Sequence, residues 1–129
     1  MTVQTRVLSA PGLALRFVLF LGWFLVLQGL AGGAAKVADG DTGDLLHNAL
    51  HLVSGLGALW AIRMGHAAAA RFAVGFGVGY LLLALAGLVF PRGLVSAALQ
   101  LRTPDQIFHT VIGLTGFAVG INATNARER

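Results

Sequence analysis

Four stretches of this sequence are almost free of Asp, Glu, Lys and Arg, and each is long enough to cross a lipid bilayer. They are residues 17–35, 45–62, 72–90 and 105–121. A hydrocarbon core of ~30 Å requires a helix of about 20 apolar residues. Backbone polar groups inside a bilayer must be paired within the protein, which favours helices. The pattern therefore predicts an all-α fold, a four-transmembrane-helix bundle forming a single integral membrane domain over residues 1–129.

The composition excludes the main alternative classes. Hydrophobic residues make up 57% of the chain and charged residues only 11%, whereas soluble domains carry about 25% charged residues. A soluble enzyme and a disordered chain are both excluded on this basis. The absence of cysteine excludes disulfides and thiolate sites. The basic residues are scattered singly, without the cluster typical of nucleic-acid binding, so nucleic acid is not an expected partner. The expected partners are the lipid bilayer and other membrane-protein subunits.

The loops between the spans predict the orientation. Arg63 and Arg71 lie in the loop between the second and third spans, while the preceding loop carries three Asp beside Lys36. Positive residues favour the cytoplasmic side, so we expect a multi-pass protein of the bacterial cytoplasmic (inner) membrane with both termini cytoplasmic. Residues 1–33 also allow a second interpretation, a secretory signal cleaved after small residues.

The linker before the last span contains signals for a short helix and for the start of the last helix. Residues 94–101 are apolar but too short to cross the membrane, and they predict a short interfacial helix. Thr103 followed by Pro104 is typical of a helix start, with Thr as the cap and Pro in the first turn.

Two pairs of similar segments indicate an internal repeat. Residues 16–22 can be aligned with 71–77, and residues 51–55 with 109–113. The chain would then consist of two helical hairpins, each opening with Arg-Phe and closing with a His-x-x-x-Gly helix. Parallel repeats are related by an axis along the membrane normal. We therefore expect His51 and His109 at similar depth near the outer surface.

Histidines are the most informative polar residues inside the spans. His47 and His51 lie on one face of the second span, and His109 lies one turn after Asp105 on one face of the fourth. Small residues on the same faces allow helices to approach closely in lipid. We therefore expect the two faces to point inward and meet.

Three interpretations of these histidines remain open. In the first, they bind no cofactor, and His51 and His109 form hydrogen bonds with Gln28, Asn48, Thr110 or a backbone carbonyl. In the second, a divalent metal such as zinc is bound by an N/O ligand set, comprising His47, His51, Asp105 and His109. In the third, His51 and His109 are the axial ligands of haem b, as facing helices of a bundle can provide.

Other residues favour a packing role. Gly75-x-x-x-Gly79 resembles a motif by which membrane helices pack, and Tyr80 is expected to be hydrogen-bonded inside the bundle. The remaining structural residues expected are Gln28, Asn48, Gly55 and Gly113. The sequence contains no catalytic triad or phosphate loop, so an enzyme is not expected. The favoured function is a structural or accessory subunit in a larger membrane complex. The alternative is a haem- or metal-binding electron-transfer protein that uses His51 and His109.

Several motifs resemble a bacterial family of small four-helix membrane proteins known as a domain of unknown function. The motifs are Asn48-x-x-His51-x-x-x-Gly55, the link from Ala61 to Arg71, Gly77-x-x-Tyr80 followed by Gly87, and Asp105-x-x-x-His109-x-x-x-Gly113. The resemblance covers roughly residues 14–121. It implies a multi-pass membrane protein and no known activity. His47 lies outside the family's pattern.

Overall fold

The computed structural model describes residues 10–40 and 44–126, which contain helices and no strand. Four long helices are α2 (Ala10–Ala38), α3 (Leu45–Arg63), α4 (His66–Val89) and α6 (Thr103–Asn125), and a short helix, α5 (Leu94–Ala98), joins the last two. All four long helices are apolar and long enough to cross a membrane. The expected all-α four-helix fold and the short helix before the last span are both confirmed.

The helix ends extend beyond the apolar runs. α2 begins at Ala10. α4 begins at His66 because the next four residues, 67–70, are alanines, the strongest helix formers. The cap of α6 differs from the expected one. The helix starts at Thr103, and the preceding Arg102 takes the cap position, where its backbone N–H donates to Asp105 Oδ2 at 2.7 Å.

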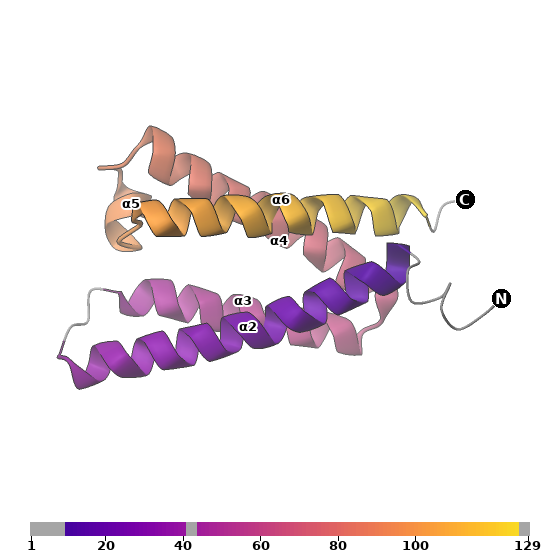
Figure 1. Ribbon diagram of the computed structural model, residues 1–129, viewed down its shortest axis with the longest axis horizontal. Coiled ribbons are helices and arrows are strands. Elements are labelled where there is room, and N and C mark those ends of the chain that lie inside the picture. Colours follow the sequence, from indigo (N-terminus) through magenta and orange to yellow (C-terminus); the bar gives the residue numbers. More distant parts are fainter. Residues whose placement is uncertain (1–9, 41–43, 127–129) are drawn as a thin grey trace.

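The bundle consists of two antiparallel hairpins, α2 with α3 and α4 with α6 (Figure 1). Contacts between the hairpins are made mainly by α2 with α4 and α6, and by α3 with α4. The start of α2 and the end of α6 lie at one end of the bundle, whereas α3 and α6 both begin at the other. The first turns of α3 and α6, the two helices that carry the histidines, therefore lie at the same end of the bundle.

The bundle interior is made of a few large side chains and many small ones. Leu21 and Leu25 of α2 pack against Phe76 and Tyr80 of α4 at its centre. Toward the end where the chain crosses from α3 to α4, the core narrows to small residues, among them Ala14, Ala58, Ala69, Ala70, Ala73 and Ala123. Many large apolar side chains face outward instead, including Phe20, Trp60, Leu82, Leu88 and Ile107. An apolar exterior around a small-residue core is the pattern of a bundle solvated by lipid.

Glycines bring the helices of each hairpin into backbone contact. A β-carbon on Gly55 would lie 2.7 Å from the carbonyl oxygen of Gly22. A β-carbon on Gly77 would lie 2.7 Å from the carbonyl oxygen of Gly113. Neither gap admits a side chain without moving a helix backbone, so each hairpin depends on glycine at its crossing point.

Gly75 and Gly79, which their spacing predicts to be a packing motif, contact no other helix in the described part of the chain. Both are exposed on α4, and nothing lies within 4 Å of a β-carbon built on either. The crossing of α4 with α6 uses Gly77 instead, which lies on the opposite face of the helix because successive residues are rotated by about 100°.

Candidate metal centre

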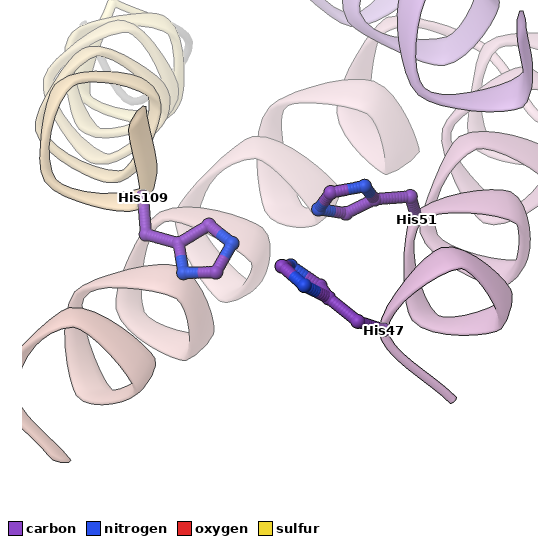
Figure 2. Close-up of side chains that lie close together, drawn as sticks. All are labelled: His47, His51 and His109. Atoms are coloured by element: carbon purple, nitrogen blue, oxygen red, sulfur yellow. The ribbon is translucent and has the colours of Figure 1, made fainter. Parts of the chain in front are cut away.

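Three histidines from two hairpins meet inside the bundle. His47 and His51 project from α3 and His109 from α6, and their rings point toward one another (Figure 2). The ring centroids are 4.5 Å apart for His47 and His51, 5.4 Å for His47 and His109, and 5.9 Å for His51 and His109. Each histidine offers a ring nitrogen that lies within 4.8 Å of those of the other two. The expected meeting of the two histidine faces is therefore present in the structure.

All three side chains are shielded from the surroundings. His47 is 7% exposed, His51 2% and His109 0%. Both ring nitrogens of His51, both of His109, and Nε2 of His47 are buried without a hydrogen-bond partner among the described residues. A buried polar nitrogen without a partner costs about 1–3 kcal/mol. Five such atoms lie in one small cluster, and the unprotonated nitrogen of a neutral imidazole can bind a metal ion.

The hydrogen bonds expected for a purely structural pair of histidines are not formed in the described part of the chain. The amide nitrogen of Asn48 donates to the backbone carbonyl of Asp44 at 2.9 Å. The hydroxyl of Thr110 donates to the carbonyl of Gln106 at 2.7 Å. Each side chain donates to the backbone carbonyl four residues earlier, which is the usual bond of a polar residue in a helix interior. Gln28 Oε1 is buried and makes no hydrogen bond.

Aromatic rings enclose the cluster. The Tyr80 ring meets His109 edge-on with centroids 5.0 Å apart, and Phe108 meets His51 edge-on at 6.0 Å. The Tyr80 hydroxyl donates to Ser54 Oγ at 3.2 Å, which ties α4 to α3 one turn from His51. Tyr80 is thus hydrogen-bonded inside the bundle, as expected from the sequence. These contacts hold the imidazoles in a restricted, apolar enclosure.

Asp44 and Asp105, at this end of the bundle, lie outside the histidine cluster. Asp44, before the first turn of α3, forms an ion pair with Lys36 at 3.6 Å. Asp105 is half-buried one turn before His109, and its carboxylate caps α6 through Arg102. Of the four expected metal ligands, the structure brings the three histidines together and holds Asp105 at the edge.

The arrangement suits a transition-metal ion. Zinc binds imidazole nitrogens at about 2.0–2.1 Å, which places the nitrogens of a tetrahedral site about 3.4 Å apart. The three histidine nitrogens lie within 4.8 Å of one another, so small side-chain rotations would bring them to coordination distance. Sites of three protein ligands and one further position are common for zinc.

The histidine motifs do not indicate one further polar residue near the site. Gln106 of α6 packs its side-chain amide against Gly87 of α4, and its Oε1 is buried without a hydrogen bond. In the first hairpin, the Asn48 amide packs in the same way against Gly32. The alignment of the two histidine segments places Gln106 opposite Asn48, which is the signal that could have found it.

A family model described as a domain of unknown function (DUF4383) matches residues 42–122, which include α3, α4, α5 and most of α6. No curated protein and no solved structure matches the chain.

Proposed function

The chain belongs to the DUF4383 family, whose function is unknown, and we propose that it is a small membrane protein that binds a transition-metal ion through His47, His51 and His109. The observation that carries the proposal is the convergence of three buried imidazoles, five of whose ring nitrogens lack hydrogen bonds in the described chain. The enclosing spans are apolar, and polar residues at such depth are costly and mark functional sites.

The donor set limits the kind of ion. Imidazole nitrogens suit zinc, copper, iron and nickel, whereas magnesium and calcium prefer oxygen ligands. The chain contains no cysteine, so a thiolate site is excluded. A zinc ion, or a copper ion if the protein transfers electrons, fits these three ligands best.

A single ion fits the geometry better than haem b. Haem ligation by His51 and His109 requires the porphyrin plane to lie between the two imidazoles. The His47 ring lies 4.5 Å from one of them and 5.4 Å from the other, in the space that the porphyrin would need. A single ion, in contrast, uses His47 as a ligand.

The proposal is tested by titrating the metal-stripped protein in detergent with Co²⁺, whose visible spectrum reports coordination. One equivalent should give the intense bands of a tetrahedral nitrogen site. His47→Gln, His51→Gln and His109→Gln should each lose these bands, and His66→Gln, at an exposed histidine of α4, should keep them. Wild-type protein that shows only the spectrum of aqueous Co²⁺ would contradict the proposal.

A second candidate function is the accessory subunit expected from the sequence. Trp23 favours it, because this side chain is 55% exposed near the middle of α2, whereas tryptophans exposed to lipid concentrate at the membrane interfaces. Trp23, Phe20 and Leu27 border a surface hollow of about 510 Å³. Native mass spectrometry of the complex extracted in mild detergent should reveal a stoichiometric partner that Trp23→Ala releases and that Leu88→Ala, at an exposed position of α4, retains. A chain extracted alone counts against this function.

A further inference from the structure

Corresponding positions of the two hairpins make the same close contacts. In the first hairpin, a β-carbon on Gly55 would meet Gly22 and Val26. In the second, a β-carbon on Gly113 would meet Gly77 and Leu81. Gly22 and Val26 each precede their counterparts in α4 by 55 residues, and Gly55 precedes Gly113 by 58. The crossing point of one hairpin therefore maps onto that of the other.

The contacts near the histidine end correspond in the same way. Asn48 packs its amide on Gly32, and Gln106 packs its amide on Gly87. Gly32 and Gly87 are again 55 residues apart, and Asn48 and Gln106 are 58 residues apart. The contacts at the crossing point and those near the histidines thus show the same offsets, 55 residues between α2 and α4 and 58 residues between α3 and α6. Residues of α3 and α6 can therefore be compared position by position along this half of the bundle.

The comparison assigns Asp105 a definite counterpart. His51 corresponds to His109, and His47, one turn earlier, corresponds to Asp105. The two helices thus present the pairs His47/His51 and Asp105/His109 toward the same cluster. Three of these four positions hold imidazoles that meet, and the fourth holds a carboxylate, which is also a zinc ligand.

Charge balance favours a carboxylate ligand such as Asp105 at this site. A divalent ion on three neutral imidazoles carries two uncompensated positive charges in an apolar enclosure, which is unfavourable without a counter-ion. Asp105 lies close enough to His51 and His109 to interact with both electrostatically. Asp44, at the same end of the bundle, already forms an ion pair with Lys36.

We propose that the Asp105 carboxylate is the fourth protein ligand of an ion held by His47, His51 and His109. The inference rests on the proposed metal-binding function. In the structure, Asp105 Oδ2 accepts the backbone N–H of Arg102 at 2.7 Å, so the carboxylate is held one helical turn from His109. To reach the ion, the Asp105 side chain would have to rotate toward the histidines or bind through its second oxygen. Ion binding and the cap of α6 are then coupled through one residue.

The test compares Zn²⁺ affinity and X-ray absorption spectra of wild-type protein, Asp105→Asn, Asp105→His and Asp44→Asn in detergent. Asn keeps an oxygen that can accept the Arg102 N–H, so the variant preserves the cap while weakening the ligand. We expect Asp105→Asn to lower the Zn²⁺ affinity by at least about tenfold, the lower bound for a loss of supporting interactions at a metal site. Asp105→His should restore tight binding with four imidazoles in the spectrum, and Asp44→Asn should bind as wild type does.

Two outcomes overturn the inference about Asp105 while leaving the metal site standing. One is an Asp105→Asn variant that binds Zn²⁺ as tightly as wild type with an unchanged absorption spectrum, while His51→Gln does not bind. The other is an equal loss in Asp44→Asn, which would indicate a general effect of negative charge. Failure of the wild-type protein to bind Zn²⁺ would instead overturn the proposed function itself, together with this inference.

Discussion

His51 of α3 and His109 of α6 place their imidazole rings 5.9 Å apart and nearly perpendicular, although they belong to different hairpins. The two helices are not among the closely packed pairs of the bundle, so the histidines bridge a gap between hairpins. His47 completes the cluster from α3. An ion bound there would join the two halves of the protein, which has consequences for its stability and shape.

Zinc should stabilise the wild-type protein and have no effect on His51→Gln or His109→Gln. A ligand that binds only the folded state adds about 2.7 kcal/mol at a concentration of one hundred times Kd. Thermal unfolding in detergent, with and without Zn²⁺, measures this effect. Without Zn²⁺, the variants lose ring contacts with Phe108 or Tyr80 but no hydrogen bond among the described residues, so their loss of stability should be smaller than the gain that Zn²⁺ gives the wild type. A large loss of stability in metal-free His51→Gln, with no effect of Zn²⁺ on wild type, would support a purely structural role.

Zn²⁺ should also narrow the distance distribution between the two hairpins near the site. The chain has no cysteine, so Leu46→Cys on α3 and Ile107→Cys on α6, both at exposed positions, provide unique sites for spin labels. Double electron–electron resonance measures the distance between the two spin labels. We expect a narrower distribution on adding Zn²⁺, and no change when His109→Gln is introduced as well. An identical distribution with and without Zn²⁺ in the unsubstituted background would contradict the bridging role.

Substitution of the crossing glycines should weaken the hairpins. Gly55→Ala and Gly113→Ala would each place a methyl group against the backbone of the neighbouring helix, and overpacking of this kind costs about 1–3 kcal/mol. Gly75→Ala and Gly79→Ala are matched controls on an open face of α4. They should be neutral or slightly stabilising, because alanine is the better helix former. Equal losses at both pairs of positions, measured by unfolding in detergent, would argue against the crossing points described for the hairpins.

Removal of the Tyr80 hydroxyl should lower the free energy of unfolding only slightly, and this loss should depend on the presence of Ser54. The phenol donates to Ser54 Oγ across two helices, and such bonds within membrane proteins contribute about 0.6 kcal/mol on average. A double-mutant cycle of Tyr80→Phe and Ser54→Ala isolates this contribution. We expect the double variant to be no less stable than the worse single variant. Fully additive losses would indicate that the two hydroxyls act separately.

The distribution of charge predicts the four spans and the short helix before the last one. The helix ends are less predictable, because α2 and α4 continue through polar positions such as Arg16 and Arg71, whose long side chains are exposed at the ends of the bundle. The cap of α6 at Arg102 depends on an acceptor at Asp105. Hydropathy alone does not reveal that local bond.

The periodicity of the polar residues predicts that the histidine faces meet. It does not predict how closely, because the separation of the rings depends on the crossing geometry of the hairpins, fixed at glycines such as Gly22 and Gly113 far along the helices. Asn48 shows the same limit. Its spacing allows a bond to a histidine, but the nearer carbonyl of Asp44 takes its amide instead. With so many glycines in the sequence, the spacing of Gly75 and Gly79 could not tell a packed face from an open one.

Equilibrium dialysis of the metal-stripped protein against Zn²⁺, followed by elemental analysis, measures how many ions each chain binds. The three-histidine site predicts one tightly bound Zn²⁺ per chain in wild type and in His66→Gln, and none in His51→Gln or His109→Gln. Wild-type protein without a stoichiometric ion, or one bound ion that survives both substitutions, would contradict it.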